Sequence, residues 1–378
     1  MKNDPEPDIG KHPGAYLRDL LNARGLTQRD LTSILGIAHT GINMIIAGKV
    51  GISAKMSKAL GLALGYPPLH FAALQTAYDV ARAANPDEMV SIRAKMHTTY
   101  PIRSMMNRGW LHDSDAEDIQ RQLALFFEVN DMGEIPYLAH APKKTRYEEK
   151  DIPPAQLAWL FRVKQISRSM AVPRYSARAL KKAIEQMKRM RIAPEEARHV
   201  PRLLSECGVR YVIVEPLPKS NIDGVCLWLN KDTPVIGMSA RYDRIDNFWF
   251  VLRHECEHVL RGHGLNSDQW MLDADIEGQR ADPNSDLQEE EQQANDAAAD
   301  FCVPSDALKS FIRRKHPIYA EQDVLGFAQI HGIAPGLIVG QLQHYLKRYQ
   351  YLRHHLVKIR HIVLPNSIVD GWGYVAPS

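Results

Sequence analysis

The sequence has few cysteines, no long apolar run and almost no net charge, and each of these absences excludes a class of protein. The four cysteines lie far apart without a CxxC pair, so we expect neither a disulfide framework nor a cysteine zinc finger. No apolar run reaches the roughly 18 residues of a membrane span, which excludes a transmembrane protein. A formal charge of +3 does not indicate a basic coat for nucleic acid.

The N-terminus also lacks the features of a secretory signal. Residues 1–11 are polar and carry three acidic side chains, where a signal has a basic segment followed by an apolar core. We therefore expect a cytoplasmic protein with no membrane partner. The 378 residues, 45% of them hydrophobic, are enough for two or three domains.

Residues 12–66 contain short apolar-patterned segments separated by glycines, which predicts a bundle of short helices. Thr27 and Asp30 predict the N-terminal cap of one helix, and Ile34 is expected in its buried stripe. A turn follows, and the next helix is predicted over residues 38–47. This is the helix-turn-helix plan, in which the second helix enters the DNA major groove. An ordinary helical bundle used for protein contacts is the alternative.

The segment from His12 to Gly65 resembles the HigA-type antitoxin branch of the XRE helix-turn-helix family, and it reads HPGAYLRDLLNARGLTQRDLTSILGIAHTGINMIIAGKVGISAKMSKALGLALG. The resemblance implies binding to double-stranded operator DNA. No arginine occurs between residues 36 and 48, so we expect weak binding by one copy and hence a homodimer. The implied DNA contacts are Gln28 and Lys49 at phosphates and His39, Thr40 and Asn43 at base edges.

The middle of the chain is charged, helical in pattern and without a chemical motif. We expect a helical connector over residues 86–200, with a solvated loop at residues 143–151 as a plausible hinge. Beyond it, three short β-rich runs, at residues 209–215, 224–229 and 234–238, predict a small sheet.

The chemical motif of the sequence is His254-Glu255-Cys256-Glu257-His258, which fits the zinc peptidase pattern HExxH. With 16 histidines and 44 acidic residues in the chain, roughly 0.08 accidental matches are expected. In a helix, two histidines four residues apart lie on one face and can bind one Zn²⁺, while the glutamate polarises a water molecule. The apolar segment before the motif indicates a buried helix, in which imidazoles need partners.

The same five residues also fit the inverted motif HxxEH, in which Glu257 would be the general base. In helical phase Glu255 lies with the apolar side chains of the helix. Glu257 lies on the opposite side, four residues from Arg253 and four from Arg261, which predicts an exposed row of ion pairs. We therefore favour Glu255 as the base, and the inverted assignment stays open.

A third ligand is expected from outside this helix. The metzincin pattern is absent because residue 264 is glycine where that pattern has histidine, although His263 could lie nearby. A helix predicted from Asp286 to about Cys302 places Glu291 on a face of small and apolar residues, which suits a zinc ligand. Asn295, one turn on, could orient a ligand. The alternative is that Glu291 belongs to a charged first turn favoured by the helix dipole.

The segment from Gly208 to Leu260, together with EQQANDAAADFCVP at residues 291–304, resembles the ImmA/IrrE family of zinc metallo-endopeptidases. The family pattern E-x-x-A-N begins at Glu291. The resemblance implies a gluzincin-like site and a protein substrate, often a DNA-binding repressor whose cleavage derepresses stress, phage or mobile-element genes. The implied site residues are the ligands His254, His258 and Glu291, the base Glu255, and Asn295 behind the ligands.

Further expectations concern the surroundings of this site. The acidic stretch at residues 264–290 predicts either a lid over the cleft or a surface loop without regular structure. His263 and Tyr242 are candidate donors to the anionic intermediate of hydrolysis. Two short helices within residues 324–344 resemble the tail of these peptidases.

The sequence therefore predicts an α+β chain that is mostly α and has four parts. These are a helix-turn-helix bundle (1–85), a helical connector (86–200), a gluzincin-type peptidase with a small sheet (201–312) and a helical extension (313–378). The predicted function is a DNA-binding regulator fused to a zinc endopeptidase that cleaves a regulatory protein. The alternative is a HigA-like antitoxin or repressor, with a toxin as partner, whose peptidase domain only senses or binds.

Overall fold

The computed structural model describes residues 4–8, 10–87, 89–130, 153–265, 271–274 and 286–376. The chain forms two compact units, Met1–Val90 and Ser91–Ser378, which we call the N-terminal unit and the C-terminal unit. The expected hinge at residues 143–151 lies outside the described residues. The division into four parts stays a prediction. In the described ranges, no helix is long and apolar enough to cross a membrane.

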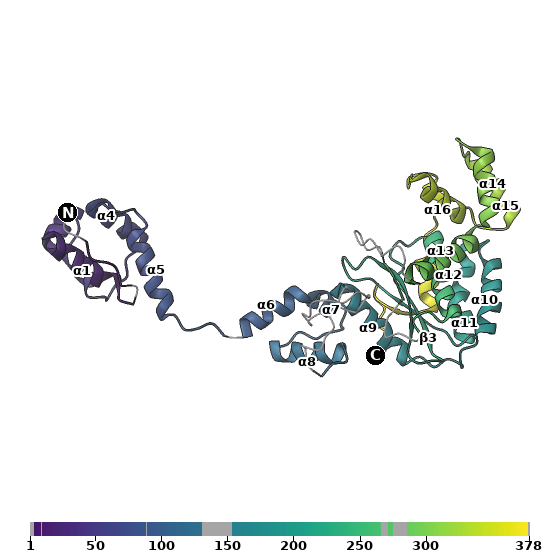
Figure 1. The fold of residues 1–378 in the computed structure, drawn as a ribbon, viewed down its shortest axis with the longest axis horizontal. Coiled ribbons are helices and arrows are strands. Elements are labelled where there is room, and N and C mark those ends of the chain that lie inside the picture. The colour runs from purple at the N-terminus through teal and green to yellow at the C-terminus, as the bar shows by residue number, and fades with distance from the viewer. Residues whose placement is uncertain are drawn as a thin grey trace. The chain divides into compact units, whose positions relative to one another are not determined.

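The N-terminal unit is helical (Figure 1) and has the predicted cap at Thr27. Thr27 accepts a hydrogen bond from the backbone N–H of Asp30, and Asp30 accepts one from the N–H of Thr27, which forms the expected capping box. Gly36, with φ 64°, makes the turn to the next helix. The helices are α1 (Pro13–Arg24), α2 (Gln28–Leu35), α3 (His39–Ile46), α4 (Ala54–Leu64) and α5 (His70–Arg82).

The core of the N-terminal unit forms where α1 to α5 meet, with Leu17, Leu31, Ile42 and Phe71 fully buried. The expectation for Ile34 was wrong, because its side chain is 55% exposed. Helix α2 has only eight residues, so its buried stripe is narrow and centres on Leu31.

A mixed five-stranded sheet organises the C-terminal unit, with strand order β4-β2-β3-β1-β5. Strand β1 pairs parallel with β3 and with β5, whereas β2 pairs antiparallel with β3 and with β4. The strands are β1 (Arg210–Val214), β2 (Ile222–Trp228), β3 (Pro234–Met238), β4 (Met271–Ala274) and β5 (Ile368–Asp370).

Strands β1, β2 and β3 confirm the three predicted β-rich runs, but β4 and β5 were not predicted. Strand β4 lies in the acidic stretch that was expected to be a lid or an unstructured loop, and β5 lies in the expected helical extension. Both are short, four and three residues, so neither has a readable period, and each is stabilised by pairing with a strand far away in sequence.

Helices cover both faces of the sheet (Figure 1). Helix α9 packs on the face formed by Val212, Val225 and Val235, and α12 packs on the face formed by Tyr211, Cys226 and Ile236. The segment expected to be a connector therefore includes a helix that covers the sheet. The helices of this part are α6 (Met89–Thr99), α7 (Ile102–Asn107), α8 (Ala116–Phe126), α9 (Pro154–Arg168), α10 (Ala177–Met190), α11 (Val200–Glu206), α12 (Ile245–Arg261), α13 (Asp286–Cys302), α14 (Ser305–Lys315), α15 (Glu321–His331), α16 (Pro335–Leu346) and α17 (Arg360–Val363), with 3₁₀ turns η3 (Pro194–His199), η4 (Arg353–His355) and η5 (Leu364–Asn366).

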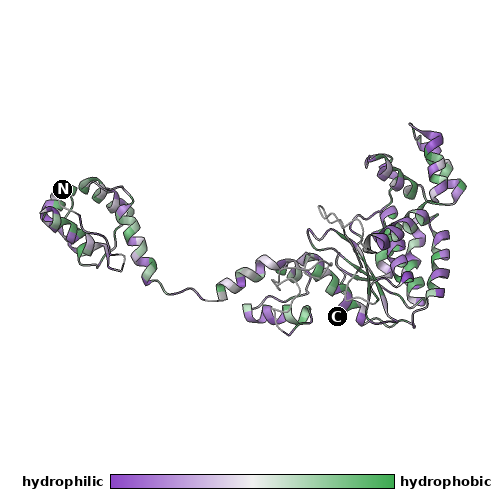
Figure 2. Cartoon of the chain, viewed as in Figure 1, coloured by the Kyte–Doolittle hydropathy of each residue, from purple (hydrophilic) through white to green (hydrophobic). Residues whose placement is uncertain are grey.

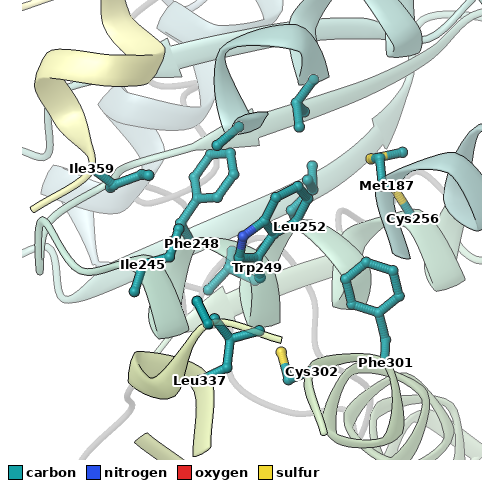
Figure 3. Close-up of a cluster of buried hydrophobic side chains, with 14 of the residues drawn as sticks. Met187, Ile245, Phe248, Trp249, Leu252, Cys256, Phe301, Cys302, Leu337 and Ile359 are labelled. Carbon is teal, nitrogen blue, oxygen red and sulfur yellow. The ribbon is translucent and has the colours of Figure 1, made fainter. Parts of the chain in front are cut away.

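A core of buried hydrophobic side chains surrounds α12 (Figure 3). Trp249 is fully buried at its centre, between Phe248 and Leu252 of the same helix and Phe301 of α13. Helix α10 contributes Met187 from a strongly amphipathic sequence, and the surrounding helices likewise carry hydrophilic and hydrophobic residues together (Figure 2). The mostly helical α+β class is confirmed.

Candidate metal centre

Helix α12 carries the HExxH residues in the middle of the core. His254 and His258 are each 1% exposed, and their Nε2 atoms lie 2.9 Å apart. The i, i+4 spacing of the helix places both imidazoles on one side, as the motif requires.

Helix α13 supplies a carboxylate to the same point. Oε2 of Glu291 lies 3.3 Å from Nε2 of His254, and Oε1 lies 3.5 Å from Nε2 of His258. Ala294 and Ala298 are fully buried, so the small side chains of this face let α13 pack closely on α12. We call His254, His258 and Glu291 the ligand cluster; each of the three offers a ligand atom, and these atoms lie within 4.8 Å of one another.

The donor set of the ligand cluster fits Zn²⁺. In a tetrahedral zinc site with bonds near 2.0–2.1 Å, ligand atoms lie about 3.3 Å apart, and the three distances in the cluster are 2.9, 3.3 and 3.5 Å. Burial, together with the neighbouring His254 and His263, lowers the pKa of His258 to about 2, so the imidazole is neutral and able to ligate. Two imidazole nitrogens and a carboxylate converge in the ligand cluster. All three are electron-pair donors, and a cation bound between them would accept these pairs.

The other ring nitrogens of the two histidines have partners that orient them. Nδ1 of His254 lies 3.1 Å from Oδ1 of Asn295, so it donates there and directs the lone pair of Nε2 toward Glu291. Nδ1 of His258 lies 2.8 Å from Nδ1 of His263. Asn295 therefore contacts His254, and its role in orienting a ligand stays a prediction.

His263 lies near the ligand cluster, in contact with His258. Its imidazole lies beside Nδ1 of His258, on the side of that ring away from Nε2. Gly262 ends α12 with φ 69°, and the N–H of His263 donates to the carbonyl of His258 across this turn. The Trp228 indole donates to the carbonyl of His263 at 2.9 Å. This geometry favours orientation of His258; the donor role stays a prediction.

Glu255 is fully buried and its carboxylate lies against the backbone of β2. A Cβ atom placed on Gly224 would come within 2.4 Å of Oε1 of Glu255 and 2.8 Å of Cγ1 of Val251. Only glycine leaves room for the carboxylate at this point of the strand. The role of Gly224 was not predicted from the sequence, although a glycine inside a strand is a signal of close approach.

Glu257 forms the two ion pairs that its spacing predicted. Its carboxylate accepts from Arg253 at 2.7 Å and from Arg261 at 2.6 Å. Burial opposes ionisation of Glu257, but these hydrogen bonds outweigh it and its pKa is lowered. The expected exposure was wrong, because Glu257 is only 8% exposed. The reason is that packing around α12 covers the side that helical phase assigned to solvent.

The remaining candidates from the sequence lie elsewhere. Tyr242 is 48% exposed, and its ring centroid lies 4.4 Å from the guanidinium carbon of Arg241. Its role as a donor to the anionic intermediate stays a prediction. Of the acidic stretch, residues 266–270 and 275–285 lie outside the described residues.

On the N-terminal unit, the candidate DNA contacts lie at the surface. His39 and Thr40 open α3, and Asn43 follows one turn later; all three side chains are exposed, as is Lys49. Gln28 begins α2 and is half-buried. Because Ile42 and Ile45 are buried, α3 has a core face and a face that is open to a ligand.

Each of the two units contains a segment that matches a known protein family. Residues 17–71 match the helix-turn-helix family, and residues 208–333 match the peptidase M78 family, described as an IrrE N-terminal-like domain. The chain is also similar to Virulence-associated protein A' of Dichelobacter nodosus, with 34% identity over 83 residues, which cover 22% of this chain and 67% of that protein.

Two solved structures are similar to part of the chain. An antidote protein of a plasmid maintenance system from Nostoc punctiforme has 26% identity and a TM-score of 0.19, and the match covers 23% of this chain and 91% of that one. An addiction module antidote protein of a HigA family from Coxiella burnetii has 24% identity and a TM-score of 0.19, covering 24% and 92%.

The fold and the matched families define a protein with an N-terminal helix-turn-helix domain and a metallopeptidase-type domain in its C-terminal unit. More particularly, the first domain is of the XRE type and the second is a member of the IrrE/ImmA-like peptidase family. The resemblances to the XRE helix-turn-helix family and to the ImmA/IrrE peptidases are confirmed.

Proposed function

We propose that the C-terminal unit is a zinc-dependent endopeptidase and that the N-terminal unit binds operator DNA, so that the chain is a regulator that also cleaves a regulatory protein. The observation that carries the peptidase assignment is the ligand cluster, with Glu255 directly after its first histidine and pressed against β2.

His254, His258 and Glu291 would hold Zn²⁺, which when bound acts as a Lewis acid on a peptide carbonyl and on water. Glu255 takes a proton from the attacking water and passes it to the leaving amine. Asn295 and His263 keep the two imidazoles in the orientation and tautomer that ligation needs.

The substrate is a protein in extended conformation, and by the family resemblance a DNA-binding repressor. Strand β4 is at the edge of the sheet as described, next to β2, whose Gly224 contacts the base Glu255. A peptide that adds a strand at this edge would pair with β4, one strand away from β2.

The test compares Glu255→Gln with Glu257→Gln in cleavage of a repressor encoded beside the gene, with metal content measured on both proteins. Glu255→Gln should bind zinc and lose cleavage, whereas Glu257→Gln should keep cleavage. Loss of cleavage in Glu257→Gln alone would contradict the assignment of the base. Glu291→Gln should lose zinc, because it removes one of three ligands.

DNA binding is supported by the exposed residues of α3. It is expected to need two copies of the chain, since the N-terminal unit carries little positive charge. Along α5 and the turn before it, apolar side chains lie exposed at helical spacing, with Leu69 at 75% and Val80 at 68%. This stripe suits a homodimer contact. Operator binding should fall in Asn43→Ala, and sedimentation of the full chain should show a dimer.

A second candidate function is that of a HigA-like antitoxin or repressor whose peptidase domain senses or binds without cleaving. The resemblance of residues 12–65 to HigA-type antitoxins favours it. Stoichiometric zinc without cleavage, together with promoter binding that Asn43→Ala abolishes, would support this candidate. Genes next to this one would name a toxin or a repressor as the partner.

A further inference from the structure

A second group of metal-ligating side chains lies in the C-terminal part of the chain and shares no residue with the ligand cluster. Glu321 begins α15, and His354 and His355 belong to η4; their ligand atoms lie within 4.8 Å of one another. Nε2 of each histidine lies 2.8 Å from Oε1 of Glu321. Two imidazoles and one carboxylate form the same donor set as in the ligand cluster.

The two segments that carry these side chains are already joined. The hydroxyl of Tyr351 donates to the carbonyl of Tyr319, two residues before Glu321. The amide of Gln343 donates to the carbonyl of Tyr351 at 2.7 Å. The carbonyl of His355 lies so close to α16 that a Cβ on Gly336 would come within 2.5 Å of it. These contacts hold together the segments that carry Glu321, His354 and His355.

We propose that Glu321, His354 and His355 bind a divalent transition metal ion, with Zn²⁺ as the ion to test. Ligand atoms about 3.3 Å apart suit tetrahedral zinc, so each nitrogen-to-oxygen distance needs to open by about 0.5 Å. His354 and Glu321, which are 63% and 45% exposed, can make this shift and admit the ion from solvent. His355, 16% exposed, is the more fixed ligand.

Metal at this site joins α15 to the segment that follows η4. The N–H groups of Ile359 and Arg360 donate to Oδ1 of Asp243 at 2.9 and 2.8 Å, which ties that segment to the loop before α12. Beyond it, β5 pairs with β1 in the sheet. The bound ion therefore stabilises the attachment of the C-terminal strand, and this role does not depend on peptidase activity.

The experiment counts zinc on the full chain. Protein stripped with a chelator is dialysed against low-micromolar free Zn²⁺, and bound zinc is measured by elemental analysis. Wild type should hold two equivalents, His354→Gln/His355→Gln one, and His254→Asn/His258→Asn one. His361→Gln removes an exposed histidine from the neighbouring α17 and should still hold two.

Thermal unfolding provides the second readout. Zinc should raise the midpoint of wild type and of His361→Gln more than that of His354→Gln/His355→Gln, because one stabilising ion is lost. Glu321→Gln, a single surface change, should show the same zinc content and the same midpoint shift as the double variant. It provides the test if the double variant misfolds. One equivalent on wild type that a folded His354→Gln/His355→Gln variant retains, or two equivalents on that variant, would show that the three side chains only hydrogen-bond to one another.

Discussion

Replacing Gly224 with alanine should reduce peptide cleavage strongly while leaving the metal in place. The added Cβ would lie 2.4 Å from Oε1 of Glu255, whereas ordinary contacts of a Cβ begin at 3.4 Å. The carboxylate therefore has to move by about 1 Å, and a misplacement of that size lowers the catalytic rate by on the order of 100-fold. Overpacking costs about 1–3 kcal/mol of stability, which leaves the protein folded at the assay temperature.

The assay measures kcat for repressor cleavage alongside zinc content and the unfolding midpoint. Gly326→Ala is the matched control, because a Cβ there meets nothing within 4 Å and the residue lies inside α15. The double variant Gly224→Ala/Glu255→Gln should be no slower than Glu255→Gln alone, since both changes act on one carboxylate. A folded, zinc-loaded Gly224→Ala that cleaves at the wild-type rate would refute the reasoning.

Three further predictions concern other parts of the chain. His263→Ala should weaken zinc binding by about 10- to 100-fold, measured by chelator competition, because His258 loses the partner of its Nδ1. Asn43→Ala should weaken operator binding by about 1–3 kcal/mol, measured by fluorescence anisotropy, with little effect on cleavage. The hydrogen bonds from Arg24 and Tyr66 lower the pKa of Asp4 to about 2 from its ordinary 3.8. Its stabilising effect is therefore present above pH 3.8 and lost as the pH falls through 2, so Asp4→Asn should flatten the pH dependence of unfolding of the N-terminal unit.

Each of these predictions has a contrary result. Unchanged zinc affinity in His263→Ala would mean that its contact with His258 does not orient the ligand. Equal loss of binding to operator and to unrelated DNA in Asn43→Ala would indicate a general effect rather than base recognition. For Asp4→Asn, an unfolding curve that keeps the wild-type pH dependence would assign the acid transition to other carboxylates.

Several features of this protein were predictable from the sequence because they depend on neighbours along the chain. The capping box at Thr27 and the turn at Gly36 are local, and they define the helix-turn-helix that the family match confirms. The i, i+4 spacing of His254 and His258 likewise sets their common side in any helix. The peptidase family is confirmed by the match at residues 208–333.

Other features depend on contacts between segments far apart in sequence, and helical phase or composition does not determine them. The burial of Glu257, the pairing of β5 with β1 and the approach of Gly224 to Glu255 all result from tertiary packing. Strands as short as β4 and β5 acquire their hydrogen bonds only from a partner strand. Their own sequence pattern is therefore too short to predict a strand.

The sequence by itself determined which residues could ligate a metal and which helix presents two of them. The tertiary structure decided that Glu291 of α13 meets those histidines, that His263 lies behind His258, and that Glu255 lies in a gap left by a glycine. The physical reason is that a motif records spacing within one helix, whereas a site needs ligand atoms a few ångströms apart. Only the packing of α13 and β2 against α12 brings them that close.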